Sequence, residues 1–194
     1  MISATEALEQ LHDGNRRYLA GKSNSDSIRG HKSGMEAGQS PFAVVLACSD
    51  SRVPVEMIFD QGPGDLFVTR VAGNIAAPSQ LGSIEFAVTQ LGARLVVVLG
   101  HSNCGAVSAT LQDLAESQED LSPNLRAIVD RIRPAVAGLP NPTLHEAIVA
   151  NVRESLERLR TDSAVLRGLI DAGEIEAVGA EYSIETGRVT FFDD

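Results

Sequence analysis

Short runs of aliphatic residues alternate with longer segments of helical periodicity along most of the chain. Three runs of strand length lie at residues 42–47, 66–71 and 95–99, each bounded by turn-forming or polar residues. Continuous apolar runs of this length are typical of buried parallel strands. Helical patterns follow at residues 83–91 and 104–114, and two or three more extend through residue 172. This alternation of strands and helices predicts an open α/β sheet.

The first forty residues are expected to form a helix followed by an extended arm. Residues 3–6 have the spacing of a capping box, and the apolar positions that follow predict a helix over about residues 4–19, with Asn15 interrupting its apolar stripe. Residues 20–40 are rich in Gly and Ser and show no period. A connection this long inside a compact domain is typical of an arm or a functional loop. We interpret residues 1–40 as an N-terminal helical arm for oligomerisation.

Residues 41–194 are expected to form one α/β domain. Residues 175–182 and 188–192 have strand character and are joined through a short turn at 185–187, which predicts a terminal strand pair. The predicted fold is a central, mostly parallel sheet with an antiparallel C-terminal edge strand, flanked by helices. No internal repeat or second domain is evident.

The charge balance excludes one class of partner. The chain has 16 Lys and Arg residues against 26 Asp and Glu residues, a net charge of −10. Phosphate backbones are held mainly by clustered Lys and Arg, so the chain is not a nucleic-acid binder driven by bulk charge.

The N-terminus has no basic segment before an apolar run, and the longest uncharged stretch, 95–112, is polar at its middle. We expect a cytoplasmic protein without a membrane partner.

The first of two polar motifs contains Cys48, Asp50 and Arg52 and comes directly after the predicted strand at 42–47. In an extended chain, residues two apart share a face, so the thiolate, carboxylate and guanidinium are expected to project in a row. Pro54 suits the first turn of a short helix that ends this segment.

The second motif contains His101 and Cys104. Gly100 closes the preceding strand, and Cys104 opens the next helix. The dipole of a helix lowers the pKa of a thiol at its N-terminus and so favours the thiolate form that metals bind. Both motifs lie at the carboxyl ends of predicted parallel strands, where open α/β sheets place their sites, so we expect the two motifs to face one another.

Two thiolates and one imidazole would then converge. This donor set is typical of catalytic zinc sites, which leave the fourth tetrahedral position to water, whereas structural sites use four protein ligands. The nearby candidate for a fourth ligand is Asp50. We therefore predict a metal centre at Cys48, His101 and Cys104, with the Asp50–Arg52 ion pair orienting one carboxylate oxygen beside it.

Blander interpretations compete with this one. Alone, a cysteine after an aliphatic strand is most often a small buried hydrophobe, and an Asp–Arg pair is most often a surface ion pair. Pairing of the two cysteines would instead indicate a thiol redox sensor. The segment 100–105 has the spacing of a phosphate-binding loop, but Ala106 stands where such a loop needs Lys. We assign no functional role to the remaining histidines, which lack a motif: His12, His31 and His145.

Together the two motifs resemble the signature of the β-class carbonic anhydrases, Cys-x-Asp-x-Arg followed by His-x-x-Cys. The similarity extends over most of the chain and is most specific across residues 46–107. It implies one Zn²⁺ per chain held by Cys48, His101 and Cys104, with Asp50 and Arg52 as the catalytic dyad. It also implies reversible hydration of carbon dioxide to bicarbonate and a proton by attack of zinc-bound hydroxide. Residues 41–194 would then be the zinc-binding catalytic domain.

The resemblance further implies a homodimer or homotetramer, with active sites near the subunit interface and the N-terminal arm laid over the partner. Gln61, Phe67 and Phe86 match positions that line the substrate pocket, although Phe86 stands where Tyr is frequent. Carbonyl sulfide and carbon disulfide hydrolases use the same fold and ligands and are the alternative activity.

One branch of this family has a bicarbonate-inhibition site built from a Trp, an Arg and a Tyr. Val45 stands at the Trp position here, while Arg70 and Tyr182 match the other two. We therefore predict that the inhibitory site is absent or weak.

Overall fold

The computed structural model describes residues 2–23, 36, 38–116 and 121–192. Its centre is one five-stranded sheet in the order β2-β1-β3-β4-β5. Strands β1 to β4 are parallel to their neighbours, and β5 runs antiparallel to β4. The strands are β1 (Ala43–Ala47), β2 (Leu66–Arg70), β3 (Leu95–His101), β4 (Glu176–Tyr182) and β5 (Val189–Phe191). The predicted sheet, with its antiparallel edge strand at the C-terminal end, is confirmed.

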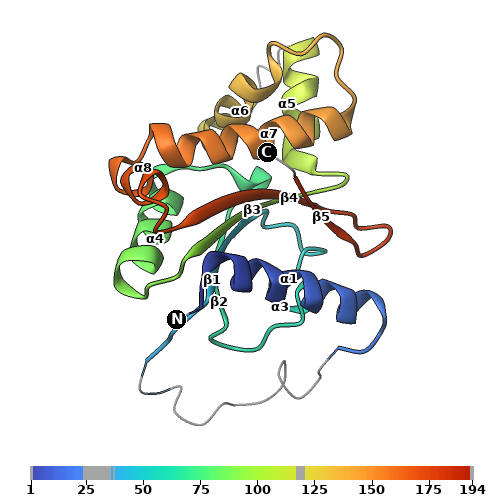
Figure 1. The fold of residues 1–194 in the computed structure, drawn as a ribbon. Helices are drawn as coiled ribbons and strands as arrows, with labels where there is room; N and C mark the ends of the chain where they lie inside the picture. The colour runs from blue at the N-terminus through green and yellow to red at the C-terminus, as the bar shows by residue number, and fades with distance from the viewer. Residues whose placement is uncertain (1, 24–35, 37, 117–120, 193–194) are drawn as a thin grey trace.

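Helices cover both faces of this sheet (Figure 1). They are α1 (Ala4–Leu19), α3 (Val55–Ile58), η2 (Ala72–Asn74), α4 (Pro78–Gln90), α5 (Gly105–Ala115), α6 (Pro123–Val136), α7 (Leu144–Thr161) and α8 (Ala164–Asp171). The predicted helix at 83–91 begins five residues earlier than expected, at Pro78, because proline lacks the N–H that a first helical turn leaves unpaired. Three helices fill the stretch up to residue 172, within the expected range.

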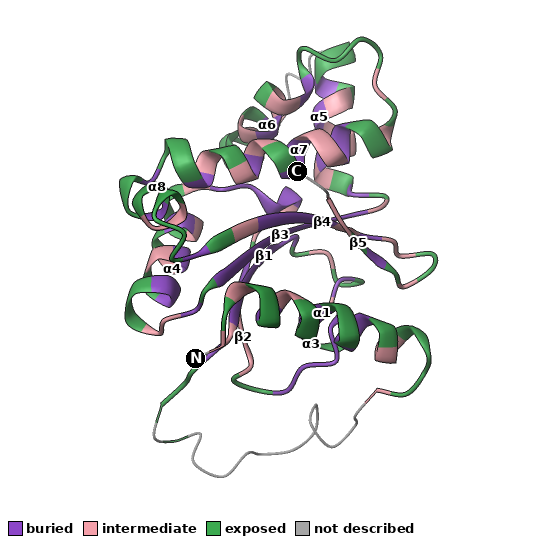
Figure 2. Cartoon of the chain, in the orientation of Figure 1, coloured by how far each residue is buried: buried purple, intermediate pink, exposed green. Residues whose placement is uncertain are grey.

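Two apolar layers hold the sheet between the helices. Alternate β-strand side chains pack on α1 and α3 on one face, and on α4, α7 and α8 on the other. Strands β1 and β3 are buried along their whole length, as Figure 2 shows. This burial on both faces explains why β1, and β3 up to Leu99, consist of uninterrupted aliphatic residues.

Helix α1 packs against the sheet of its own chain through Ala7 and Leu11. Asn15, expected as a polar interruption of the apolar stripe, lies on the buried face of α1. Asn15 is only 5% exposed, and its amide donates to the carbonyls of Ile58 and Gly187 at 3.1 and 3.0 Å while accepting from the N–H of Val189 at 2.9 Å. It therefore ties α1 to α3 and to the β4–β5 hairpin. Most of residues 20–40, including His31, lie outside the described residues, so the oligomerisation arm stays a prediction.

The strand order places the two motifs together. The chain runs from β1 outward to β2 and then crosses back to β3 on the other side of β1. Ligands of open α/β sheets bind in the crevice at such a reversal, outside the carboxyl ends of the strands. Cys48 follows β1 and His101 ends β3, so both lie at this point.

Candidate metal centre

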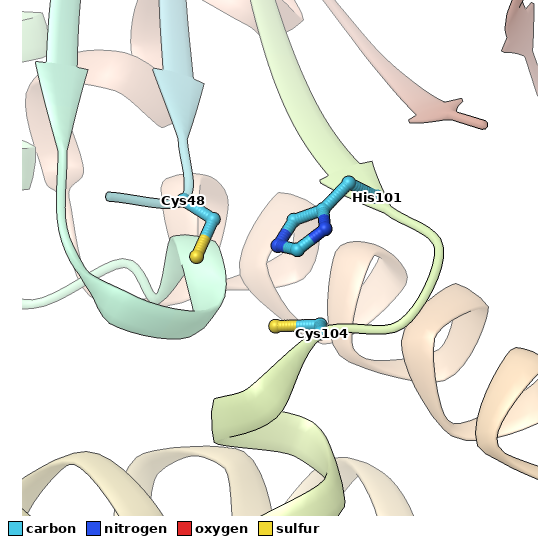
Figure 3. Close-up of side chains that lie close together, drawn as sticks. All are labelled: Cys48, His101 and Cys104. Atoms are coloured by element: carbon cyan, nitrogen blue, oxygen red, sulfur yellow. The ribbon is translucent and has the colours of Figure 1, made fainter. Parts of the chain in front are cut away.

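Cys48, His101 and Cys104 converge at the carboxyl edge of the sheet. Their potential ligand atoms all lie within 4.8 Å of one another. Figure 3 shows the three side chains pointing toward one another from the end of β1, the end of β3 and the start of α5. All three residues are buried. No other group of this kind occurs in the part of the chain that the structure describes.

The backbone around each residue explains this convergence. Ala47 and Leu99 are paired in the parallel register of β1 and β3, so Cys48 lies beside the last residues of β3. Strand β3 continues one residue further than expected and ends at His101 rather than Gly100. The chain then turns at Asn103, whose φ of 57° is left-handed, and Cys104 forms the N-cap of α5. The prediction that Cys104 opens a helix is confirmed.

The tautomer of His101 is fixed by its neighbour. His101 Nδ1 lies 2.9 Å from the carbonyl oxygen of Ser102, and a carbonyl can only accept, so Nδ1 carries the proton. This leaves the lone pair on Nε2. His101 is fully buried, and its Nε2 has no hydrogen-bond partner. Buried polar atoms without partners are costly, and this one faces two sulfurs, as a metal-binding imidazole does.

The two sulfurs share one proton. The hydrogen bond from Cys104 lowers the pKa of the Cys48 thiol to about 4, and the same contact raises the pKa of Cys104. Burial lowers the pKa of His101, but the Cys48 sulfur, the Ser102 carbonyl and the Asp50 carboxylate together outweigh burial and leave that pKa raised. A divalent cation among these atoms would replace the shared proton and neutralise both thiolates. The donor set therefore fits Zn²⁺, for which two sulfurs and one imidazole are ordinary ligands.

The chain turns at residues 50–53, where the N–H of Val53 donates to the carbonyl of Asp50 at 3.0 Å, so the extended segment expected over residues 48–52 is interrupted there. The reason is a local hydrogen bond: the Asp50 carboxylate accepts from the backbone N–H of Arg52 at 2.9 Å. The Arg52 guanidinium also donates to both oxygens of this carboxylate, from Nε to Oδ1 at 2.9 Å and from Nη2 to Oδ2 at 2.7 Å. This bidentate pair holds the pKa of Asp50 well below its usual range.

The Asp50–Arg52 ion pair lies next to the candidate metal ligands. Asp50 Oδ2 lies 4.0 Å from Nε2 of His101. The Arg52 guanidinium also donates to the backbone carbonyl of Asn103 at 3.3 Å, which connects the first motif to the second. The expected Asp50–Arg52 ion pair is therefore present and lies beside the cluster.

Arg70 makes a contribution that the sequence analysis missed. From the end of β2, its guanidinium donates to the carbonyls of Cys48 and Asp50 at 3.0 and 2.7 Å. The signal was available in part, because Arg70 lies at the carboxyl end of a predicted parallel strand, at the same sheet edge as both motifs. Its partners are backbone atoms, however, and a sequence motif does not reveal these.

The expected pocket residues are spread over the chain. Gln61 is buried near α1 and donates to the carbonyl of Phe59 at 2.8 Å. Phe67 of β2 and Phe86 of α4 contact each other, with ring centroids 6.3 Å apart, and Phe86 is 48% exposed. Neither this hydrogen bond nor this ring contact involves the cysteines. Their role in a substrate pocket stays a prediction.

The three positions matched to an inhibitory site lie on three different strands, and Val45 and Tyr182 belong to the same apolar cluster. Val45 is buried in β1 and Tyr182 is buried at the end of β4, where burial raises the pKa of its phenol to about 12. Among the histidines given no role, His12 packs on the ring of Phe191 and His145 is exposed beside Glu181. The weak or absent inhibition stays a prediction.

Two further features concern the surface of the molecule and its relation to membranes. A groove of about 780 Å³ lies between the C-terminal part of α6 and α7, and none of the candidate site residues lines it. In the described ranges, no helix is both long and apolar enough to cross a bilayer.

Comparisons with known proteins identify the family. A family model described as carbonic anhydrase matches residues 43–189, a range that contains both motifs. Carbonic anhydrase 2 of Mycobacterium tuberculosis (strain ATCC 25618 / H37Rv) is 40% identical over 196 residues, which cover 96% of this chain and 92% of the relative. The chain belongs to the carbonic anhydrase family.

Further relatives refine this placement. The carbonic anhydrase of Mycolicibacterium smegmatis (strain ATCC 700084 / mc(2)155) is 42% identical over 190 residues, covering 94% of this chain and 90% of the relative. The solved structure of the beta-carbonic anhydrase CcaA superposes with a TM-score of 0.74 at 28% identity, covering 96% of this chain and 87% of that one. The resemblance to the β-class carbonic anhydrases is thus confirmed, and hydration of carbon dioxide is the general function of the family.

Proposed function

We propose that this carbonic anhydrase is a zinc lyase (carbonate dehydratase) that interconverts carbon dioxide and bicarbonate at Cys48, His101 and Cys104. The observation that carries the proposal is the buried, unpartnered Nε2 of His101, which lies with the two cysteine sulfurs in a cluster no wider than 4.8 Å. One Zn²⁺ per chain would be held by these three residues. When bound, zinc supplies the Lewis acidity that makes water a strong nucleophile near neutral pH.

Asp50 prepares the nucleophile. Because its pKa is held low, Asp50 is ionised throughout the neutral range and can only accept hydrogen bonds. It takes a hydrogen bond from the attacking oxygen and so turns the lone pair of that oxygen toward carbon dioxide. Arg52 keeps both carboxylate oxygens in place, and Arg70 fixes the backbone that carries Asp50. The proton that the reaction releases leaves to solvent.

The experiment combines metal analysis with a stopped-flow carbon dioxide hydration assay on the purified chain. We expect about one zinc per chain and rapid hydration, and Cys48→Ser should lose both signals. Ser79→Ala, in the exposed first turn of α4, is the control and should change neither. A zinc-free chain with a Cys48–Cys104 disulfide would instead favour the thiol redox sensor. Zinc with turnover of carbonyl sulfide or carbon disulfide but not carbon dioxide would favour the hydrolase alternative.

We also propose that the chain acts as a homodimer or homotetramer in the cytoplasm. The related structures from Sordaria macrospora are described as tetrameric. Exposed Phe86 and Met57 are apolar side chains that a second copy can cover. The cytoplasm suits a centre with two free cysteines, because thiols stay reduced there. Sedimentation of the zinc-loaded chain measures the assembly, and a monomer at micromolar concentration would contradict it.

A further inference from the structure

A second contact on Cys48 comes from the short turn η2. The backbone N–H of Gly73 donates to the Cys48 sulfur at 3.3 Å. This geometry depends on two consecutive left-handed residues, Gly73 with φ of 73° and Asn74 with φ of 43°. A single left-handed residue is ordinary in a turn, but a non-glycine residue such as Asn74 holds that conformation only where its surroundings stabilise it.

Helix α7 supplies that stabilisation. The Asn151 side-chain amide donates to the carbonyl of Gly73 at 2.7 Å, and the Ser155 hydroxyl donates to the carbonyl of Asn74 at 3.1 Å. Asn151 and Ser155 are four residues apart, so they lie on one face of the helix. Both are almost fully buried. Two polar side chains in the apolar layer of α7 thus bond to the two left-handed residues of η2.

Packing alone does not account for this arrangement. Apolar residues would fill the same face of α7 without the cost of burying polar atoms. This cost is not offset at two buried amide atoms, because Asn151 Oδ1 and Asn74 Nδ2 have no hydrogen-bond partner. Gly73 is also enclosed, because a Cβ there would meet Ile132 Cδ1 at 2.7 Å. The turn is therefore held from two sides, and its N–H points at a sulfur.

We propose that Asn151 and Ser155 are positioning residues of the metal centre, which act through η2. By fixing the carbonyls of Gly73 and Asn74, they keep the Gly73 N–H on the Cys48 sulfur. A hydrogen bond to a thiolate withdraws charge from it, and such outer contacts tune both the metal and its retention. The inference rests on the metal site proposed above, but not on carbon dioxide being the substrate.

The test uses the full chain loaded with Co²⁺, whose sulfur-to-cobalt charge-transfer absorption reports the charge on the sulfurs. Asn151→Leu and Ser155→Ala remove the two donors separately. We expect the charge-transfer band to move to longer wavelength in both variants, because a sulfur without its hydrogen bond gives up charge more easily. We also expect zinc to pass to a chelator about tenfold faster than from the unmodified chain.

Ser163→Ala is the matched control. Ser163 is equally buried, but its hydroxyl caps α8 and bonds Glu85, away from η2. It should lower thermal stability without moving the band or the zinc release rate. Ser155→Ala removes a single oxygen and keeps the comparison available if Asn151→Leu does not fold.

Four results decide the outcome. A shifted band and faster release in Ser155→Ala, with neither in Ser163→Ala, supports the inference. An unchanged band and rate in Ser155→Ala overturns it and leaves Asn151 and Ser155 as structural residues. A chain that takes up no Co²⁺ overturns the site and the inference together, whereas Co²⁺ uptake without carbon dioxide hydration refutes only the proposed function.

Discussion

At the scale of single residues, the chemistry of this carbonic anhydrase depends on the protonation states of His101 and Asp50. The Ser102 carbonyl places the proton of His101 on Nδ1, and the Arg52 guanidinium keeps Asp50 ionised. His101 is buried and Asp50 is half-buried, so a wrong protonation state of either would leave a charge or a donor unmatched. The site is therefore set up for one arrangement of charges before substrate arrives.

Asp50→Asn tests the role of the carboxylate. We expect turnover to fall by about 100-fold, since an amide no longer offers two acceptor oxygens to the nucleophile, while zinc content is unchanged. Stopped-flow hydration and metal analysis on the same sample measure the two quantities. Asp171→Asn removes an exposed carboxylate that pairs with Arg160 and should leave the rate as it is. Equal rates for Asp50→Asn and the unmodified chain would contradict the assigned role.

The lowered pKa of Asp50 also predicts how stability depends on pH. A carboxylate whose pKa is lower in the folded state stabilises that state above its unfolded pKa of about 3.9 and loses this effect as pH falls. The unmodified chain should therefore exceed Asp50→Asn in free energy of unfolding at pH 7, and the gap should shrink toward pH 3. Urea titrations at the two values measure the gap, and a gap that widens in acid is the contrary result.

At the scale of elements, a few buried contacts fix how helices and strands meet. Asn15 joins α1 to elements 43 and 172 residues away along the chain. Glycines in β3 and β4 let α7 approach the sheet closely: a Cβ at Gly100 would meet Val152 Cγ2 at 2.6 Å. Such close approach brings the polar side chains of α7 to η2.

Asn15→Ala tests the first of these contacts. It removes hydrogen bonds to three backbone groups, two of them buried and one part-buried, so we expect a loss of about 3 kcal/mol in the free energy of unfolding. Urea denaturation measures this loss, and Glu9→Ala, an exposed change in the same helix, should cost less than about 0.5 kcal/mol. Similar stabilities for the two variants would show that Asn15 is not a structural tie.

Gly179→Ala and Gly168→Ala test the second contact as a pair. A Cβ at Gly179 would meet Phe192 at 2.8 Å and Leu156 at 2.9 Å, so this change should destabilise the protein by about 2 kcal/mol. A Cβ at Gly168, inside α8, meets nothing within 4 Å and should stabilise by about 1 kcal/mol through helix propensity. Thermal denaturation of both compares them directly, and equal shifts would count against close packing by α7.

At the scale of the whole molecule, the metal centre joins segments far apart in sequence. Its candidate ligands follow β1, end β3 and cap α5, while η2 contacts Cys48 and α7 in turn bonds to η2. An ion that binds only this folded arrangement stabilises it by mass action. Metal content and global stability are therefore expected to change together.

Removing zinc with a chelator should make this coupling visible. With free zinc at about 100 times its dissociation constant, binding adds about 3 kcal/mol, so removal should lower the thermal midpoint by about 10 °C. Both cysteines should also become open to alkylation, which a thiol assay counts. Added zinc should reverse both changes. An unchanged midpoint in a chain proved metal-free would argue that the centre does not contribute to the fold.

The sequence by itself determined the elements and the chemically active set. Aliphatic runs and helical periods are local signals, so they located the strands, the helices and the antiparallel edge strand. The spacing of Cys48, His101 and Cys104 at strand ends was likewise enough to expect one cluster, because parallel strands bring their carboxyl ends to one edge. Asp50 and Arg52 followed from the same motif.

Only the tertiary structure decided which polar side chains bond to the backbone of distant segments. Asn15, Arg70, Asn151 and Ser155 bond mainly to backbone atoms of distant segments; Asn151 and its partner are 78 residues apart. Every residue carries the same backbone carbonyl, so the side-chain pattern of the sequence does not predict which carbonyl a polar side chain will bond. The turn at residues 50–53 was missed for a related reason, since Asp50 accepts hydrogen bonds from the N–H groups of Arg52 and Val53 where an extended segment was expected. Long-range packing, rather than local periodicity, selects these partners.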